Sequence, residues 1–342
     1  MILRILTFLI LSRGESGWHI FEGEYLFTFA QITDTHIGQT RMAGLVLENV
    51  TDWILEKKNV AFLVHTGDLV ENSDSRAAWE DAYKGMHRLD GVCNWTNLAG
   101  NHDVIHYGQV NFSNYEKYVG LKAINRFVVV KNRLLFILLS WTTMDGRIPT
   151  KTLEWMDNVI NNYSHMNTVI CLHPYLYPYS LFGIKNTPLL PLTVPNAEEV
   201  WDHINKHRNV ILTLSGHVHN NWVRIRVANN HEVWSICTEN LANRGYVRLF
   251  DVYTDRIEVY AYSSWEKVSY DGPLDQFTIN LGSNDRDYDR DLWSDSIDPM
   301  PTDPWIPNVI VISITAIGTL SAYLITRKIQ KRRLNCHWWA FP

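Results

Sequence analysis

The sequence predicts an α/β protein in which parallel strands alternate with helices. Residues 25–32 and the run that begins at Val60 and leads to Asp68 are apolar and rich in β-branched and aromatic side chains, which is typical of buried strands. Between them, residues 40–57 carry apolar side chains at helical spacing. A strand, a helix and a second strand in this order indicate parallel pairing, with helices covering the faces of the sheet.

Four further segments are predicted to be helices. Ser73 or Asp74 is the expected N-cap of the first, and Thr150 or Thr152 that of the third. The four segments are residues 73–89, 111–120, 150–162 and 197–207.

The other predicted strands fall into two groups. A third strand begins at Val92, residues 126–130 and 134–139 read as an antiparallel hairpin, and residues 169–172 and 210–215 are buried strands. The proline-rich loop over residues 174–195 excludes regular structure there. Four short strands follow, and their spacing suggests an antiparallel block that forms a second sheet: residues 221–227, 232–237, 245–252 and 256–262.

The two ends of the chain carry segments of a different kind. Residues 1–16 resemble a secretory signal peptide. Residues 307–326 contain a charge-free run near the length that crosses a bilayer, and residues 327–342 are basic. Basic residues gather on the cytoplasmic side of such spans. We therefore expect a single-pass membrane protein with its C-terminus inside and the domain over residues 25–265 outside. Residues 266–304 would be a C-terminal extension and acidic linker.

Composition and charge exclude some classes of protein. The 342 residues carry a net charge of −5, which gives no basic field for nucleic acid. The four cysteines form no Cys-x-x-Cys pair, so a zinc–thiolate or redox site is not expected. Four Asn-x-Ser/Thr triplets would suit an exterior glycoprotein, and they begin at Asn49, Asn94, Asn111 and Asn162.

Oxygen and nitrogen ligands follow five of the predicted strands. In open α/β sheets, the carboxyl ends of the strands are where sites form. The mixture of imidazole and carboxylate without thiolate suits Mn, Fe, Zn or Co ions. The segments concerned are Asp34-Thr35-His36, Gly67-Asp68, Gly100-Asn101-His102-Asp103, His173 and Gly216-His217-Val218-His219.

These five motifs, in this order, resemble the calcineurin-like metallophosphoesterase superfamily over roughly residues 25–260. The resemblance implies a four-layer α/β/β/α sandwich of two mixed sheets with a dinuclear metal site at the strand ends. It implies that Asp34, His36 and His219 hold the first metal ion. It further implies that Asn101, His173 and His217 hold the second ion and that Asp68 bridges the two.

The same resemblance implies the roles of two catalytic residues. His102 would face the substrate and assist the leaving oxygen, and Asp103 could orient His102. Two ions about 3.5–4 Å apart can activate water and clamp the attacking and leaving oxygens. The expected reaction is hydrolysis of a phosphate mono- or diester by in-line attack of a metal-bound hydroxide. The substrate would be a small molecule or a lipid headgroup.

Residues next to the motifs indicate which branch of the superfamily the sequence resembles. Glu71 stands where purple acid phosphatases have a metal-binding tyrosine, and Glu71-Asn72 departs from the Ser/Thr protein phosphatase pattern. The closest resemblance is to the cyclic-nucleotide-phosphodiesterase-like and sphingomyelinase-like branch. Glu71 and Asn72 could support the ligands, whereas His65 lies outside the motifs and is expected to be structural. A metal-dependent nuclease and a non-catalytic surface binding protein on the same scaffold remain alternatives.

Overall fold

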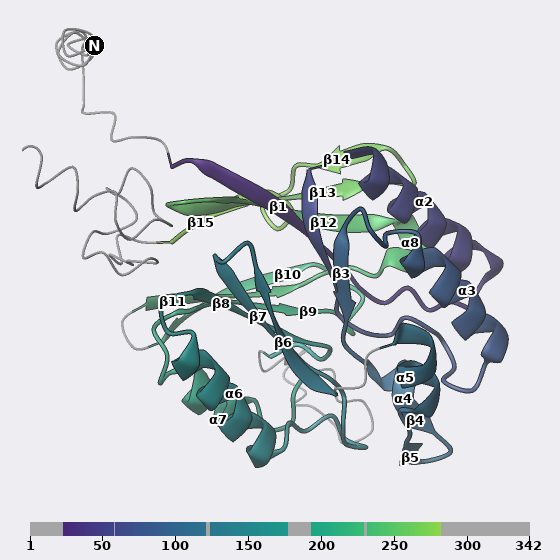
Figure 1. Cartoon of the computed structure of the whole chain (residues 1–342), viewed down its shortest axis with the longest axis horizontal. Helices are drawn as coiled ribbons and strands as arrows, with labels where there is room; N and C mark the ends of the chain where they lie inside the picture. Colours follow the sequence, from purple (N-terminus) through teal and green to yellow (C-terminus); the bar gives the residue numbers. More distant parts are fainter. Residues whose placement is uncertain (1–22, 58, 121–123, 177–192, 229–230, 282–342) are drawn as a thin grey trace, which may run out of the picture.

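The computed structural model describes residues 23–281 with the exception of 58, 121–123, 177–192 and 229–230. The strands form two large mixed sheets that face each other, as Figure 1 shows. Helices cover the outer face of each sheet, so the layers run helices, sheet, sheet, helices.

The first sheet has the strand order β14-β13-β12-β1-β2-β3, and β15 also pairs with β13. Its β1–β2 and β2–β3 pairs are parallel, and the other pairs are antiparallel. The strands are β1 (Tyr25–Ile32), β2 (Val60–His65), β3 (Asn94–Asn97), β12 (Tyr246–Tyr253), β13 (Arg256–Ser263), β14 (Val268–Tyr270) and β15 (Phe277–Asn280).

The second sheet has the order β10-β11-β9-β8-β7-β6. Its three central pairs are parallel, and β10–β11 and β6–β7 are antiparallel. The strands are β6 (Asn125–Val130), β7 (Leu134–Leu139), β8 (Asn167–Leu172), β9 (Val210–Ser215), β10 (Trp222–Ala228) and β11 (His231–Cys237). A separate two-stranded hairpin consists of β4 (Ile105–His106) and β5 (Gln109–Val110).

Helices lie on both outer faces (Figure 1). The side chains of α2 and α3 pack on the first sheet, and those of α6 and α7 pack on the second. The helices are α2 (Arg41–Lys57), α3 (Arg76–His87), α4 (Asn101–Val104), α5 (Ser113–Val119), α6 (Thr150–Asn162), α7 (Ala197–Ile204) and α8 (Leu241–Arg244).

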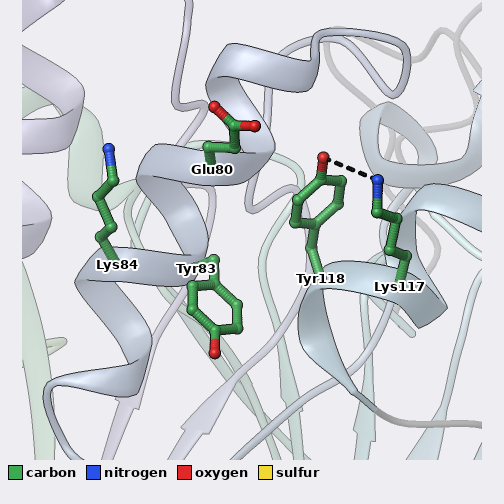
Figure 2. Close-up of a pocket in the computed structure, with 5 residues that line it drawn as sticks. All are labelled: Glu80, Tyr83, Lys84, Lys117 and Tyr118. Atoms are coloured by element: carbon green, nitrogen blue, oxygen red, sulfur yellow. Dashed lines mark hydrogen bonds between the residues drawn. The ribbon is translucent and has the colours of Figure 1, made fainter.

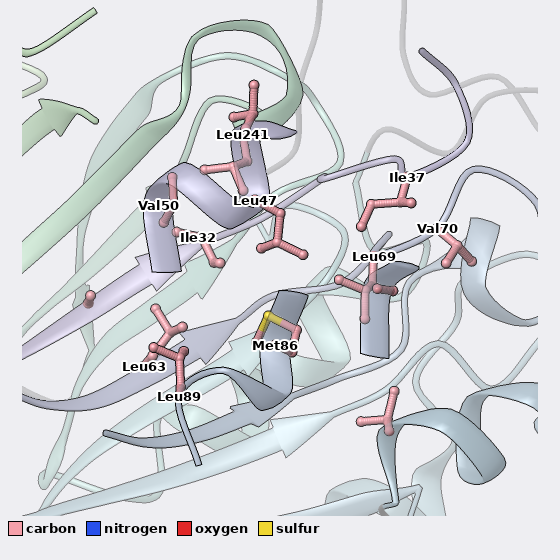
Figure 3. Close-up of a cluster of buried hydrophobic side chains, with 14 of the residues drawn as sticks. Ile32, Ile37, Leu47, Val50, Leu63, Leu69, Val70, Met86, Leu89 and Leu241 are labelled. Atoms are coloured by element: carbon pink, nitrogen blue, oxygen red, sulfur yellow. The ribbon is translucent and has the colours of Figure 1, made fainter. Parts of the chain in front are cut away.

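The central strands are apolar throughout because both of their faces are buried. On β1, Phe27 and Phe29 point between the sheets, whereas Ala30 and Ile32 point toward the helices. This alternation places each strand between two cores. Figure 3 shows the helix-side core of the first sheet, where Ile32 and Leu63 lie near Leu47 and Met86.

The parallel register brings the ends of neighbouring strands level. Ile32 pairs with His65, and His65 pairs with Asn97. The loops that follow β1, β2 and β3 therefore begin at one edge of the first sheet. In the second sheet Cys171 pairs with Leu214, which aligns the ends of β8 and β9 in the same way.

Most predicted elements are confirmed, with two corrections. The predicted strand over residues 25–32 is β1 and the predicted hairpin is β6–β7. The predicted antiparallel block is wrong, because β10 and β11 extend the second sheet while β12 and β13 extend the first. The strands β10 and β11 form one antiparallel hairpin, and β12 and β13 form another. Which sheet each hairpin joins depends on long-range packing, which the spacing of strands along the sequence does not show.

The predicted helix caps are also wrong. Ser75, not Ser73 or Asp74, caps α3 by accepting a hydrogen bond from the Ala78 amide. Helix α6 begins after Pro149, which offers no side-chain cap. Pro149 stands at the N-cap with an extended backbone, and its carbonyl accepts from the Thr152 amide at 2.8 Å.

The predicted terminal segments lie almost wholly beyond the described part of the chain. Residues 1–16, 282–304, 307–326 and 327–342 are outside it. Of the predicted extension, residues 266–281 are described, and they contribute β14 and β15 to the first sheet. Within the described residues, no helix combines the length and the apolar character that a membrane crossing needs.

Candidate dinuclear metal centre

Ligand-type side chains from five loops meet at the strand ends of both sheets. The loops after β1, β2 and β3 contribute Asp34 and His36, Asp68, and the segment 101–103. The loops after β8 and β9 contribute His173 and the pair His217 and His219. Positions up to 185 residues apart therefore form one site, as the order of motifs predicts.

The first group of ligands is Asp34, His36 and His219. Asp34 Oδ1 lies 3.3 Å from His219 Nε2 and 3.7 Å from His36 Nε2. The two Nε2 atoms are 3.0 Å apart. The three ligand atoms lie close together, and two ring nitrogens with a carboxylate oxygen are donors that suit a transition-metal ion.

The second group is Asp68, His173 and His217. Asp68 Oδ2 lies 2.9 Å from His173 Nε2, and His173 Nε2 lies 3.1 Å from His217 Nδ1. His173 Nδ1 donates to the Thr66 carbonyl at 2.8 Å. This bond fixes the tautomer and leaves Nε2 as the ligand atom, as for most metal-binding histidines.

Asp68 stands between the two groups. Its Oδ2 is 3.9 Å from His36 Nε2 in the first group and 2.9 Å from His173 Nε2 in the second. Its Oδ1 accepts the His102 amide at 2.8 Å. This position fits the bridging role that the resemblance implies.

Buried oxygen atoms without hydrogen-bond partners indicate that the site suits metal ions. Among the described residues, Asp34 Oδ1 and Asn101 Oδ1 are buried and accept no hydrogen bond. Asp34 Oδ2, in contrast, accepts from Thr33 Oγ1 at 2.6 Å and from the His217 amide at 2.9 Å. Buried polar atoms are normally paired, so an oxygen left free among imidazoles fits a metal ligand.

His102 lies beside the first group with one ring nitrogen engaged. Its Nδ1 donates to the Glu71 carbonyl at 2.8 Å, which leaves Nε2 free for chemistry. Its ring packs edge-to-face on His36 at 4.8 Å. The Glu71 carboxylate lies 2.7 Å from His36 Nδ1, so the expectation that Glu71 supports a ligand agrees with the structure.

Asp103 is fully buried and is bound by backbone amides. Its Oδ1 accepts from the Val70 amide at 3.1 Å and its Oδ2 from the Gly100 amide at 2.9 Å. Among the described contacts, the His102 ring is oriented by the hydrogen bond that it donates to the Glu71 carbonyl, and not by Asp103. Asp103 instead ties the loop after β2 to the loop after β3. Burial, together with the nearby Asp68 charge, raises the pKa of the Asp103 carboxyl to about 7.

The backbone at the ligands is unusual. Five ligand residues have φ between 48° and 68°, in the left-handed region that side chains other than glycine seldom adopt. Each such residue costs of order 1 kcal/mol or more and persists only where its surroundings enforce it. These residues are Asp34, His36, Asp68, His217 and His219.

The surroundings of Asp68 and His173 favour the charged form of each side chain. Burial acts to raise the pKa of the Asp68 carboxyl, but the charge and the hydrogen bond of His173, together with the charge of His102, outweigh burial and lower this pKa to about 2. Burial acts to lower the pKa of His173, but Asp68 and Asp34 raise it to about 9. The Asp68 carboxylate and the His173 imidazole therefore stabilise each other as opposite charges, and a metal ion would take the place of the imidazole proton.

Two residues beside the ligands were not predicted from sequence. Trp141 is buried, and its ring lies 5.5 Å from that of His217 and 6.1 Å from that of His173. His65 is also buried and joins two of the ligand loops. Neither belongs to a motif, and only their positions at strand ends could have drawn attention to them.

A separate surface cavity of about 390 Å³ lies between α3 and α5. Figure 2 shows its lining residues, Glu80, Tyr83, Lys84, Lys117 and Tyr118. None of the predicted site residues lines it. The metal-ligand groups, rather than this cavity, therefore mark the candidate active site.

The fold and the ligand groups are typical of metal-dependent phosphoesterases. The family model of calcineurin-like phosphoesterases matches residues 27–221, and the chain belongs to this family. Its His and Asp groups are candidate metal sites of the kind found in dinuclear members of this family.

Among the proteins that resemble the chain are two relatives by sequence and two solved structures. YvnB of Bacillus subtilis is 25% identical over 297 residues, which cover 75% of this chain and 22% of YvnB. The chain thus spans about a fifth of that relative. A 3′,5′-cyclic-nucleotide phosphodiesterase from Nostoc sp., alr5338, is 24% identical over 211 residues, which cover 58% of this chain and 74% of the enzyme.

The solved structures share the fold at low identity. A dimetal phosphatase from Danio rerio superposes with a TM-score of 0.58 at 15% identity, over 75% of this chain and 99% of that chain. A purple acid phosphatase from yellow lupin, Lupinus luteus, gives a TM-score of 0.53 at 13% identity, over 76% and 55% of the two chains.

Proposed function

We propose that this protein hydrolyses phosphate esters with water at a site that binds two metal ions. The observation that carries the proposal is the pair of ligand groups, Asp34-His36-His219 and Asp68-His173-His217, joined by the Asp68 carboxylate. Phosphate esters are anions, so their hydrolysis depends on neutralising charge at the reacting centre.

The residues divide into ligands and a proton carrier. Asp34, His36 and His219 would hold one ion, Asn101, His173 and His217 the other, and Asp68 both. Such a pair of ions, when bound, would activate water and neutralise charge on the phosphate. The metals proposed are Mn, Fe, Zn or Co, because the donors are nitrogen and oxygen without thiolate.

His102 would give a proton to the leaving oxygen. Because its Nδ1 donates to the Glu71 carbonyl, Nε2 is the nitrogen that can take up and release a proton. The side chain is 36% exposed, so a bound ester could reach it. General acid catalysis of this kind contributes about 10²- to 10⁴-fold to a rate.

Phosphodiesters are the first substrates to test. The Nostoc relative is a 3′,5′-cyclic-nucleotide phosphodiesterase, and the motifs resemble that branch and the sphingomyelinase-like branch. A small phosphodiester would need no basic surface for recognition, which agrees with the net charge of −5.

The test is a hydrolysis panel on the full chain, first freed of metal and then loaded with Mn, Zn, Fe or Co. It compares a nitrophenyl phosphomonoester with the matching diester and with a cyclic nucleotide. We expect turnover only with metal, and its loss in Asp68→Asn. Two bound ions without turnover on any ester would contradict the proposal and favour a binding protein.

The role of His102 is tested with leaving groups of different basicity. His102→Gln should slow an alkyl ester by about 10²-fold or more and a nitrophenyl ester much less, because nitrophenolate leaves without a proton. His231→Gln is the matched control, since His231 bonds to the Val210 carbonyl at the other end of the second sheet. Equal losses for both esters would contradict a proton-donating role.

We also propose that residues 307–326 anchor the protein in a membrane with the catalytic domain outside. This rests on the charge-free run and the basic residues that follow it. Carbonate extraction and protease protection of the expressed full chain test it. Release of the intact chain by carbonate, or a protected catalytic domain, would contradict it.

A further inference from the structure

His65 lies directly beneath two of the ligand loops. It is the last residue of β2, and its side chain is fully buried. Its Nδ1 accepts a hydrogen bond from the Gly67 amide at 3.2 Å, and its Nε2 lies 2.7 Å from Thr35 Oγ1. One imidazole therefore spans the loop after β1 and the loop after β2.

The pattern of hydrogen bonds assigns the tautomer of His65. An amide can only donate, so Nδ1 carries no proton and Nε2–H donates to the Thr35 hydroxyl. Burial lowers the pKa of His65 to about 4, so the ring stays neutral near neutral pH. A neutral ring keeps one acceptor and one donor, which is what the two loops require.

Both loops that His65 joins have strained backbones at the ligands. Thr35 lies between Asp34 and His36, whose φ values are 52° and 48°. Gly67 precedes Asp68, whose φ is 55°. Backbone bonds also connect the loops, from the Asp34 amide to the Gly67 carbonyl and from the His36 amide to the Asp68 carbonyl. Such conformations persist only where the surroundings enforce them.

We propose that His65 is a positioning residue of the metal centre, which holds Asp34, His36 and Asp68 in their ligand geometry through Thr35 and Gly67. The proposal rests on the proposed dinuclear function. It assigns a role to a histidine that touches neither the ions nor the substrate.

The two ions should depend on His65 to different degrees. Two ligands of the first ion, Asp34 and His36, flank Thr35 directly. His173, in the second group, is oriented by the Thr66 carbonyl instead. Loss of the His65–Thr35 hydrogen bond should therefore lower the affinity for the first ion more than the affinity for the second.

The experiment measures metal binding rather than turnover. Metal-free full chain is titrated with Mn²⁺ and followed by calorimetry and electron paramagnetic resonance. Thr35→Val removes the hydroxyl at nearly constant volume, and Thr35→Ser restores it. We expect Thr35→Val to weaken one of two ions by ~10- to 100-fold, the usual effect of losing a partner of a ligand. Thr35→Ser should bind like the wild type, and His65→Leu should match Thr35→Val.

A control separates positioning from stability. Asn209 is buried and donates to the Met166 carbonyl and to Thr168 Oγ1, beside the opening residues of β8 and β9. Asn209→Leu should lower the melting temperature and leave both Mn²⁺ affinities unchanged. The proposal is overturned if Thr35→Val and His65→Leu bind both ions as the wild type does, or if the wild type binds none. Failure of the proposed function would appear separately, as two bound ions without ester hydrolysis.

Discussion

Gly100 leaves room for the Asp68 carboxylate at the centre of the site. A Cβ atom at this position would lie 2.2 Å from Asp68 Oδ1 and 2.5 Å from the Asp68 amide nitrogen. Gly216 is similar, because its Cβ would lie 2.0 Å from Thr33 Oγ1 and 2.2 Å from Asp34 Oδ2. The atoms that would clash belong to the backbone or to short, hydrogen-bonded side chains. Asp68 and Asp34 would therefore have to move to make room for the added Cβ atom.

We predict that Gly100→Ala removes most activity without unfolding the protein. The added methyl group would displace the Asp68 carboxylate, and a shift near 1 Å at reacting groups costs about 10²-fold in rate. Bound metal per chain, measured by plasma emission spectrometry, should fall together with phosphodiester turnover.

Gly44→Ala is the control for this substitution. Gly44 lies in α2, and a Cβ there would meet no atom within 4 Å. Alanine is favoured over glycine inside a helix by about 1 kcal/mol, so this variant should keep its activity and melt slightly higher. Full activity in Gly100→Ala would show that the Asp68 carboxylate tolerates displacement.

At the residue scale, the sequence predicts the ligands better than their supports. Asp34, His36 and Asp68 follow strands in recognisable motifs, and the structure brings all three together. His65 could not be assigned a role from sequence, because its two partners depend on how the loops after β1 and β2 fold. The His102 ring is oriented by the backbone carbonyl of residue 71, which every amino acid has, so the sequence gives no sign of this contact.

At the scale of elements, the largely buried carboxylate of Asp157 connects α6 to α7 and to the residues that follow α7. Asp157 of α6 bonds His203 at 2.8 Å, Lys206 at 3.0 Å and His207 at 2.9 Å. Its side chain is 17% exposed. Burial acts to raise the pKa of Asp157, but the hydrogen bonds from His207 and Lys206 and the charge of His203 outweigh it and hold this pKa below its usual value.

The lowered pKa of Asp157 predicts how acid affects stability. Its contribution is fully present above the unfolded-state pKa near 3.9 and is lost as pH falls through the lower folded-state value. Asp157→Asn should therefore cost about 1–2 kcal/mol of unfolding free energy at pH 7. The difference from the wild type should shrink below about pH 4, as urea unfolding at several pH values would measure.

Asp202→Asn serves as the control, because Asp202 lies exposed on α7, the helix whose His203 bonds Asp157. Its unfolding free energy should stay within about 0.5 kcal/mol of the wild type. A constant difference between Asp157→Asn and the wild type across pH would mean that packing, rather than charge, accounts for the cost.

The sequence predicted where most strands and helices lie, but it did not always predict which strands pair with each other. The strand over residues 134–139 is recognisable because all six residues are apolar, as a strand buried on both faces requires. The strands β10 to β13 were also recognisable, but their division between two sheets follows from packing across the whole molecule. The hairpin β4–β5 and helix α8 are too short to give a periodic signal.

At the scale of the whole molecule, one apolar core holds the two sheets together. Phe29 of β1 stacks on Phe250 of β12 at 4.3 Å and meets Phe136 of β7 edge-on at 5.0 Å. All three are fully buried. The ligand groups lie at the strand ends above this core and draw on both sheets, so the site exists only while the sheets stay packed.

We predict that Phe29→Ala lowers the unfolding free energy by about 3–5 kcal/mol, because it leaves a cavity between the sheets. Near- and far-ultraviolet circular dichroism should still report one transition, because neither sheet keeps its inner face covered alone. Phe127→Ala, at a side chain that is 40% exposed, should cost about 1 kcal/mol or less. Two separate transitions in either variant would mean that the sheets unfold independently.

Metal ions should stabilise the whole molecule because their ligands come from both sheets. An ion at 100 times its dissociation constant adds about 2.7 kcal/mol to the folded state. For a domain of this size, each kcal/mol raises the melting temperature by roughly 2–4 °C. Chelation of the full chain should therefore lower its melting temperature by roughly 5–10 °C, and Mn²⁺ or Zn²⁺ should restore it. Scanning fluorimetry measures both shifts. Asp68→Asn, which lacks the carboxylate shared by the two ligand groups, should respond much less to chelation. An equal response in this variant would place the stabilising metal outside the site.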